Sequence, residues 1–314
     1  MLIPRWLGSA ELESTLPDET VRRYLAANLQ RTLAGTPVRV VQPDGEGTVI
    51  MMAATVADQS LSVVKILYER TRNKTLQPPK PTLNGSVTIY NSAGDVLVTV
   101  DGAAFTGIRT AAIAGVSTKW LASSVARQAI IGSGFEAYYH AKALATLGGV
   151  QEFRIWARNR LAAEHLAHRL RLLPQFRHIV VIVSDHIKNA VWNADVITTV
   201  TASPVPLIAV DLLPKTVLIN AMGAFRPTTR ELTSDVVREA RLYADSVPAC
   251  LAEAGDYLIP AEEGLIDLHQ VRPLSQAQRD GAKIGRTIMK SVGSALFDII
   301  CAECLVRQLY SRRF

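Results

Sequence analysis

A glycine-rich turn between an apolar segment and a helical segment constrains the fold of this chain more than any other feature. The turn Gly132-Ser133-Gly134-Phe135-Glu136-Ala137 follows the apolar segment 128–131 and opens a helical segment through residues 140–144. Its first glycine permits a tight turn, its second lets the backbone approach a pyrophosphate, and its small sixth residue brings helix against strand. Amides at the helix N-terminus add positive partial charge for phosphates. The pattern predicts a dinucleotide site, and the alternative is a tight strand–helix turn without a ligand.

Short apolar segments alternate with helical segments along this second part of the chain. The strand-like segments are 128–131, 152–156, 179–182, 196–200 and 217–220. Such alternation predicts parallel strands that are joined by right-handed crossovers and covered by helices. We therefore expect a Rossmann-type, doubly wound parallel sheet.

The residues after the second of these strands bear on the choice of nucleotide. Domains that bind NAD usually carry an acidic residue about 20 residues beyond the glycine turn, where it bonds to the ribose 2′-hydroxyl. Here the segment reads Arg158-Asn159-Arg160, without an acid. Arg158 can pair with a 2′-phosphate and Arg160 could assist, whereas a carboxylate would repel that phosphate. We therefore predict NADP(H), with NAD(H) as the alternative cofactor. The competing interpretation is that both arginines are solvated charges at a helix entry.

The first part of the chain has a different pattern. Residues 11–33 have helical spacing and predict one or two surface helices. Several β-branched segments then predict a sheet. They lie at 38–41, 48–52, 61–66, 85–90 and 96–100. A helical stretch follows over about 110–122, and a long final helix is predicted over about 287–310. These elements predict a second, smaller α/β domain.

Composition narrows the class of protein. With 48% hydrophobic and 20% charged residues, the 314-residue chain is expected to fold as about two compact domains. Its net charge of +6 is not gathered into a basic stripe, and aromatic residues make up only 6%, so we expect no nucleic-acid partner. The sequence has no long apolar run and no apolar signal segment near its start, so we expect no membrane association and a cytoplasmic location.

Cysteine and histidine usage argues against a metal or disulfide site. Three cysteines cannot form a disulfide framework, and Cys301 and Cys304 lie in an apolar helical pattern typical of buried helical residues. The six histidines lack metal-ligand spacing. We therefore expect no metal.

Three cations in the first part stand beside strand or helix-start patterns. Arg39 lies in the segment 38–41, Lys65 in the segment 61–66, and Arg109 at the start of the predicted helix. A single strand cation more often faces outward. Their significance therefore depends on the motifs around them.

A series of motifs accompanies these cations in a fixed order along the chain. They are Asp101-Gly102, Thr106-Gly107-Ile108-Arg109-Thr110-Ala111-Ala112, the glycine turn, Ile219-Asn220-Ala221-Met222-Gly223-Ala224, Arg226-Pro227, Arg230-Glu231-Leu232, Tyr243-Ala244-Asp245-Ser246, Glu253-Ala254-Gly255-Asp256 and Lys290-Ser291-Val292-Gly293-Ser294-Ala295. In these motifs the chain, from about residue 38 to its end, closely resembles the ornithine cyclodeaminase/mu-crystallin family.

The resemblance implies a two-domain homodimer. Residues 1–115 with 290–314 would form the substrate-binding and dimerisation domain, and residues 116–289 the Rossmann domain. The family positions that face the nucleotide would be Thr110, Val200, Thr201, Met222, Gly223, Ser291 and Val292.

The resemblance also implies that Arg39, Lys65 and Arg109 bind a substrate carboxylate. The charges suit that role, because guanidinium and ammonium groups complement a carboxylate and a helix that begins at Arg109 would add its dipole.

One position departs from the family pattern. Cyclodeaminases of the family carry an aspartate after the Gly-Ala pair, where it serves deamination, whereas this chain has Phe225. A phenyl ring can neither accept a proton nor orient a water molecule. Glu231 has its own place in the family pattern, so we do not expect it to substitute. The departure favours the reductase members of the family.

The predicted reaction is therefore NADPH-dependent reduction of a cyclic 2-imino acid, such as Δ1-pyrroline-2-carboxylate or Δ1-piperideine-2-carboxylate, to the L-amino acid. Arg39 and Arg109 would clamp the carboxylate, Lys65 would bind it and serve the imine proton, and Phe225 would supply an apolar wall. The alternatives are ornithine cyclodeaminase, a linear amino-acid dehydrogenase, and a binding protein without catalytic activity.

Overall fold

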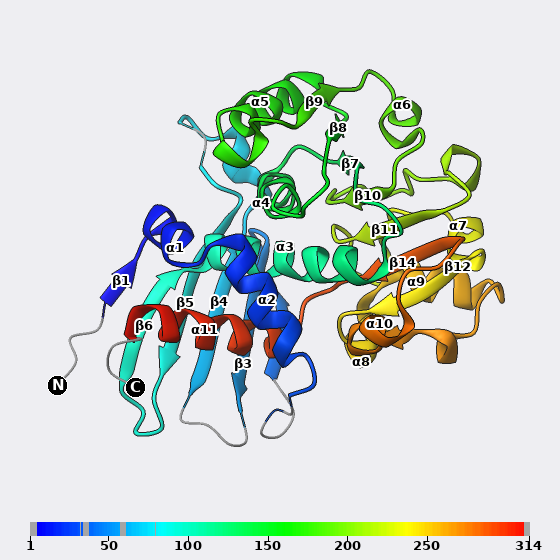
Figure 1. Cartoon of the computed structure of the whole chain (residues 1–314). Coiled ribbons are helices and arrows are strands. Elements are labelled where there is room, and N and C mark those ends of the chain that lie inside the picture. The colour runs from blue at the N-terminus through cyan, green and yellow to red at the C-terminus, as the bar shows by residue number, and fades with distance from the viewer. Residues whose placement is uncertain (1–4, 32, 34–37, 57–60, 79, 311–314) are drawn as a thin grey trace. The chain divides into compact units, whose positions relative to one another are not determined.

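The computed structural model describes residues 5–31, 33, 38–56, 61–78 and 80–310 (Figure 1). The chain forms two compact units, one of Met1–Arg109 with Ala295–Phe314 and the other of Thr110–Ser294. From the sequence we placed these divisions after residues 115 and 289. None of the helices over the described ranges has both the length and the apolar character that a membrane span requires.

The first unit is built on a six-stranded sheet with the order β1-β6-β5-β4-β3-β2. Its strands are β1 (Arg5–Leu7), β2 (Val38–Pro43), β3 (Thr48–Thr55), β4 (Ser62–Glu69), β5 (Leu83–Tyr90) and β6 (Val96–Asp101). The five strands predicted from β-branched segments are confirmed. The predicted surface helices are α1 (Ser9–Thr15) and α2 (Asp18–Asn28), and residue 32 of that prediction lies outside the described residues.

The two faces of this sheet differ in burial. Along β4 the side chains of Val63, Lys65 and Leu67 are buried. Val64 and Ile66 point to the opposite face and are exposed, because successive strand residues alternate between faces. The C-terminal helix α11 (Ala295–Tyr310) packs on β3, β4 and α2.

Two helix starts differ from those predicted. Helix α3 spans Gly102–Leu121 rather than beginning near residue 110, because the Asp101 carboxylate accepts a hydrogen bond from the Ala104 N–H (2.8 Å) and caps the helix eight residues earlier. The prediction that a helix begins at Arg109 is therefore wrong, since Arg109 lies inside α3 and the helix N-terminus is not at its side chain.

The final helix likewise begins later than predicted. Residues Arg286–Lys290 form a buried strand, β14, and Gly293 adopts a positive φ of 86° before α11 begins. The helix predicted from residue 287 is wrong over this segment. The β-branched Thr287 and Ile288 suit a strand that is buried on both faces.

The second unit contains an eight-stranded parallel sheet in the order β13-β12-β14-β11-β10-β7-β8-β9. Its strands are β7 (Arg127–Ile131), β8 (Glu152–Trp156), β9 (Val180–Val183), β10 (Val196–Thr199), β11 (Val217–Ala221), β12 (Ala240–Ala244), β13 (Arg272–Pro273) and β14. Its helices are α4 (Phe135–Leu144), α5 (Arg160–Arg171), α6 (Ile187–Val191), α7 (Ser234–Arg238), α8 (Val247–Glu253), α9 (Gly255–Glu262) and α10 (Leu274–Asp280).

The strand order confirms the predicted Rossmann-type fold. Counted from β7, the first five strands lie in the order 3-2-1-4-5, so the chain reverses direction across the sheet between β7 and β10. In open α/β sheets, ligands bind outside the carboxyl ends of the strands at such a reversal. The glycine turn directly follows β7 and therefore lies at this point.

Candidate functional site

The three predicted substrate cations lie in the first unit, and two of them meet one carboxylate. Arg39, Met52 and Lys65 are direct neighbours across β2, β3 and β4, and the Arg39 guanidinium contacts the Met52 sulfur at 3.5 Å. The Lys65 ammonium lies 2.7 Å from one oxygen of Asp298 on α11 and 2.9 Å from the other. The Arg109 Nε lies 3.1 Å from the second of these oxygens.

This cluster is almost completely desolvated. Lys65 and Asp298 are each 1% exposed, and Arg109 is 5% exposed. Burial and the neighbouring Arg109 charge lower the pKa of Lys65 to about 8, although Asp298 opposes the decrease. Lys65 therefore carries an ammonium group that can exchange its proton near neutral pH.

Sequence reasoning missed Asp298. The signal was present, because Asp298 is the one acidic residue in the apolar run 295–302 of the final helix. An acid buried in such a helix needs a partner. The partners lie more than 180 residues away in sequence, so the pattern alone could not identify them.

The glycine turn has the backbone that a phosphate cradle requires. Gly132 has φ +130° and donates its N–H to the Trp156 carbonyl (2.8 Å), and a Cβ there would lie 2.7 Å from the Val200 carbonyl. Gly134 differs, because a Cβ at this position would meet nothing within 4 Å. Gly134 is also the N-cap of α4, and because it has no side chain, the first amides of the helix have no side-chain cap. The small Ala137 is fully buried. The start of α4 thus offers open space and uncapped amides, which fits a dinucleotide pyrophosphate.

The three other residues of the turn are all partly accessible to solvent. Ser133 and Glu136 are half-buried. Phe135 is 38% exposed and packs its ring on Tyr139 at a centroid distance of 4.8 Å.

The two arginines after β8 have different surroundings. Arg160 pairs with Glu164 at 2.8 Å and with Asp185. Arg158 is exposed and makes no hydrogen bond or ion pair with any described residue. Asn159 caps α5 by accepting a hydrogen bond from the Ala162 N–H (3.1 Å). Arg158 is therefore available to an external anion, whereas the charge of Arg160 is already balanced.

One buried glutamate joins the loops that follow β10 and β11. Glu231 accepts hydrogen bonds at 2.8 Å from the Thr199 hydroxyl, from both the N–H and the hydroxyl of Thr201, and from the Gly223 N–H. A Cβ at Gly223 would lie 2.3 Å from Thr201 backbone atoms and 2.6 Å from the Glu231 carboxylate. Burial raises the pKa of Glu231, while Lys290 and the Thr201 donors oppose the rise. Glu231 therefore braces the loops that carry the predicted nucleotide-facing residues.

A buried ion pair supports Glu231 from behind. Asp256 accepts hydrogen bonds from the backbone N–H groups of Glu231 (2.8 Å) and Leu232 (3.0 Å), and its other oxygen lies 2.8 Å from the Lys290 ammonium. Both charged side chains are fully buried. Burial lowers the pKa of Lys290, but Asp256 and Glu231 outweigh this effect and raise it above its ordinary value. Lys290 is therefore a fixed positive charge.

Asp245 braces the loop after β14 in the same way. Its carboxylate accepts hydrogen bonds from the Ser291 hydroxyl (2.7 Å) and the Gly293 N–H (2.9 Å), and its other oxygen accepts a long one (3.5 Å) from the Val292 N–H. Ser291 and Val292 are both buried. Sequence reasoning assigned no role to Asp245, Asp256 or Lys290.

The remaining predicted residues are placed as follows. Thr110, Val200 and Met222 are buried within the second unit. Phe225 is half-buried, packs against that unit's apolar core, and has the Arg226 guanidinium 5.4 Å from its ring centroid. Phe225 and the first unit's cations thus belong to different units.

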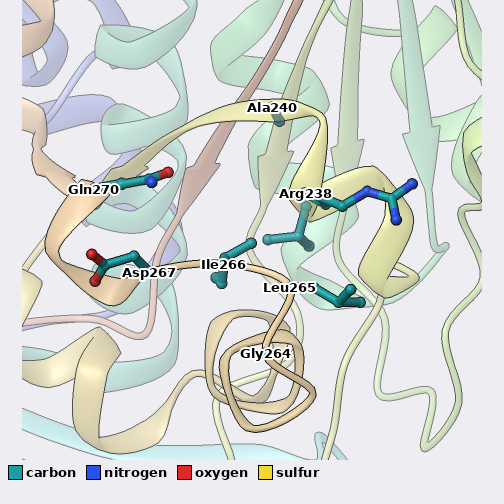
Figure 2. Close-up of a pocket in the computed structure, with 8 residues that line it drawn as sticks. Arg238, Ala240, Gly264, Leu265, Ile266, Asp267 and Gln270 are labelled. Atoms are coloured by element: carbon teal, nitrogen blue, oxygen red, sulfur yellow. The ribbon is translucent and has the colours of Figure 1, made fainter.

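A pocket of about 380 Å³ lies elsewhere in the second unit (Figure 2). It is lined by the end of α7, the first residue of β12 and the loop 264–270, so it lies at the amino end of a strand rather than the carboxyl end. Figure 2 shows the Arg238 and Asp267 head groups pointing in different directions. None of the predicted site residues lines it.

Within the described ranges, no three His, Cys, Asp or Glu side chains gather in an arrangement that would hold a metal ion.

A family model and several known proteins match most of this chain. The ornithine cyclodeaminase/mu-crystallin family model matches residues 11–312. A Δ1-pyrroline-2-carboxylate reductase of Bacillus cereus is 33% identical over 287 residues, which cover 88% of this chain and 86% of that protein. The ketimine reductase mu-crystallin of Mus musculus is 32% identical over 278 residues, which cover 85% and 83%.

Solved structures share the fold. The Δ1-pyrroline-2-carboxylate reductase of Thermococcus litoralis, in complex with NADH and L-proline, superposes with a TM-score of 0.86 at 24% identity and covers 99% of this chain and 98% of its own. An archaeal alanine dehydrogenase dimer with bound NAD superposes with a TM-score of 0.85 at 20% identity, over 99% of this chain and 97% of its own.

Alanine substitution at the two glycines of the turn should affect stability to different extents. Gly132→Ala should lower the free energy of unfolding by about 2 kcal/mol or more, because it adds a side chain at positive φ against the Val200 carbonyl. Gly134→Ala enters open space at an ordinary φ and should change it by less than about 0.5 kcal/mol. Urea unfolding followed by circular dichroism measures both, and equal losses would contradict the distinction.

Proposed function

Because this chain belongs to the ornithine cyclodeaminase/mu-crystallin family and is an NAD(P)-dependent oxidoreductase of that family, we propose that it reduces a cyclic 2-imino acid to the L-amino acid. The substrate would be of the Δ1-pyrroline-2-carboxylate or Δ1-piperideine-2-carboxylate type, and the preferred cofactor NADPH. The observation that carries this proposal is the desolvated ammonium of Lys65, held between a carboxylate and a second cation.

The first unit supplies the charge that a substrate carboxylate needs. Arg39, Lys65 and Arg109 bring three positive charges, and Asp298 compensates one of them. A carboxylate anion reduces the remaining imbalance, and a guanidinium can bind it through two parallel hydrogen bonds. The cluster therefore holds the acid group of the substrate and orients the C=N bond beside it.

Lys65 also supplies the proton that reduction requires. Its pKa of about 8 keeps it protonated at neutral pH but leaves the proton transferable. Lys65 gives this proton to the imine nitrogen, becomes a neutral amine and takes up a proton from water again after the product has left. Bound at the glycine turn, a reduced nicotinamide dinucleotide supplies the hydride that the imine carbon takes up, so that C=N becomes CH–NH.

The second unit would hold that dinucleotide by its loops at the carboxyl ends of the strands. The turn after β7 and the first amides of α4 suit the pyrophosphate. The loops braced by Glu231 and Asp245 carry residues that are expected to face the nucleotide. Arg158, which is exposed, would pair with a 2′-phosphate.

Phe225 supports reduction over deamination. Its ring packs on the apolar core of the second unit and offers no group to activate water for release of ammonia. An apolar side chain also excludes water from a reactive imine.

The proposed reaction predicts that the rate of imine reduction depends on the Lys65 side chain and on its protonation. Lys65→Met should lower kcat with Δ1-pyrroline-2-carboxylate or Δ1-piperideine-2-carboxylate by about 100-fold or more, because it removes the proton donor. For the unaltered enzyme, kcat/KM should fall as pH rises through about 8, since deprotonated Lys65 cannot donate. NADPH consumption across a pH series measures both effects. Ammonia release from ornithine without imine reduction would instead identify a cyclodeaminase.

The proposed role of Arg158 predicts a preference for NADPH over NADH that depends on this side chain. Arg158→Gln should raise the KM for NADPH by about 10- to 100-fold and leave that for NADH unchanged, because a charge-assisted contact with the 2′-phosphate is lost. The matched control is Arg177→Gln, another exposed arginine of the same unit, which should change neither value. A preference for NADH in the unaltered enzyme would contradict the assignment.

The exposed face of the first unit's sheet supports the predicted homodimer. Val40, Val64, Ile66 and Tyr68 on β2 and β4 share this face, and each is between 38% and 42% exposed. A sheet face of this character usually packs on another apolar surface. We propose that a second copy of the chain covers it.

This assignment predicts a change in oligomeric state. Ile66→Asp should shift the protein from dimer to monomer in light scattering coupled to gel filtration, because it places an unpaired charge in the interface. Val180→Asp introduces the same charge on an exposed strand residue of the second unit and should leave the dimer intact. Identical masses for all three proteins would remove this face from the interface.

A further inference from the structure

Asp298 lies at the centre of the buried cation cluster. Its two oxygens both contact the Lys65 ammonium, at 2.7 and 2.9 Å, and one of them also contacts the Arg109 Nε at 3.1 Å. The two cations therefore share an oxygen, so a displacement of the carboxylate would move both. Neither the motif pattern nor the family resemblance gave this residue a role.

The groups that face Lys65 are mostly positive or neutral. Arg109 on α3 and Arg39 on β2 act on it as cations, and Asp298 is the anion on α11 that opposes them. The buried Cys301 thiol on α11 is also near, and burial raises its pKa well above its ordinary value, so it stays neutral. Asp298 is thus the charge that favours the protonated form of Lys65 in this neighbourhood.

We propose that Asp298 is a positioning residue of the reductive step: it fixes the Lys65 ammonium and the Arg109 guanidinium at a shared carboxylate oxygen and keeps Lys65 protonated among buried cations. The effect of Asp298 on catalysis rests on the proposed function, whereas its effect on the protonation of Lys65 does not. Burial and two neighbouring cations would otherwise drive the proton from Lys65.

The same arrangement couples binding of the substrate carboxylate to protonation of Lys65. A substrate carboxylate would bring a second anion to the cluster and would raise the pKa of Lys65 further. Lys65 would therefore be protonated over a wider pH range when substrate is bound. Asp298 already stabilises the protonated form of Lys65 before the substrate binds.

The first test measures the Lys65 proton directly. In protein with ¹³Cε-labelled lysine, the Lys65 resonance is assigned by its loss in Lys65→Arg and is titrated by NMR without substrate or cofactor. Asp298→Asn should lower the titration midpoint of Lys65 by about one pH unit or more, because it removes the opposing charge while nearly keeping the shape. An unchanged midpoint would overturn the inference, whatever the imine assays give.

The same helix provides a matched control. Glu303 on α11 is also a buried carboxylate, 3% exposed, but it pairs with Arg31 and accepts a hydrogen bond from the Tyr24 hydroxyl (3.2 Å). Glu303→Gln should leave the Lys65 midpoint unchanged. A comparable shift in both variants would show a general loosening of α11 and would also overturn the inference.

The second test is the pH profile of imine reduction. In Asp298→Asn the fall of kcat/KM at high pH should move to lower pH, so that the loss of rate is large at pH 8 and smaller at pH 6. A merely structural defect would lower the rate equally at every pH and would contradict the positioning role. Failure of all imines in the unaltered enzyme, with the NMR shift present, would reject the proposed function and retain the effect on Lys65.

A third variant covers a failure of Asp298→Asn to fold. Asp298→Glu keeps the charge but displaces the carboxylate by one methylene. It should keep the Lys65 midpoint near that of the unaltered protein and lower kcat about 10-fold or more, because the two cations move with the shared oxygen. An unchanged kcat would overturn the positional part of the inference.

Discussion

Burying an ammonium group is the constraint on which both units of the molecule depend. Removing such an ion from water costs several kcal/mol unless a carboxylate and further hydrogen bonds compensate. Lys65 in the first unit and Lys290 in the second are each almost inaccessible to solvent, and each lies within 2.8 Å of an aspartate carboxylate. In the first unit the aspartate comes from α11, so the last helix of the chain is joined to β4 by charge as well as by apolar packing. The interaction that fixes this helix is therefore also the one that builds the cation cluster.

The two lysines are distinguished by their second neighbours. Lys65 has Arg109 and Arg39 near it, and the pKa of its ammonium is lowered to about 8 by burial and by these charges. Lys290 has Glu231 beside its aspartate partner, and these two anions outweigh burial and raise its pKa. A lysine that can release its proton near neutral pH is suited to acid–base chemistry, whereas one that cannot is suited to holding structure. The same residue type thus carries a proton that can be released near neutral pH in one unit and a fixed positive charge in the other.

Sequence patterns predicted what depends on local periodicity and missed what depends on distant contacts. The glycine turn, the alternation after it and the β-branched segments before it were sufficient to predict a doubly wound parallel sheet and five strands of the first sheet. The start of α3 was missed because the cap comes from Asp101, a residue inside a strand, and because Gly102 and Gly107 weaken the helical pattern. The strand β14 was assigned to a helix because a strand buried on both faces is apolar without alternation.

For the candidate site, the limit of sequence reasoning was again sequence separation. The three cations were found as cations, but their shared partner Asp298 lies in the last helix, and no local pattern joins residues 65, 109 and 298. The network of Asp256 and Lys290 was missed for the same reason, because its members are 34 residues apart and meet only once the parallel sheet has formed. Motif spacing identified which segments lie at the carboxyl ends of the strands. The structure then showed which buried charged side chains hold those segments in place.

The acidic residues near the carboxyl ends of these strands also bear on which group could donate or accept a proton. Among the described residues of the second unit, Glu231, Asp245 and Asp256 are the buried carboxylates beside the loops that carry the predicted nucleotide-facing residues. Each is already engaged: Glu231 accepts five hydrogen bonds, Asp245 holds the loop after β14, and Asp256 pairs with Lys290. A carboxylate used in this way cannot also take the place of an acid at Phe225 without releasing a loop and leaving buried donors unpaired. In the proposed reduction, the proton for the imine nitrogen would therefore come from elsewhere, and Lys65, whose pKa is lowered to about 8, is the donor that we propose.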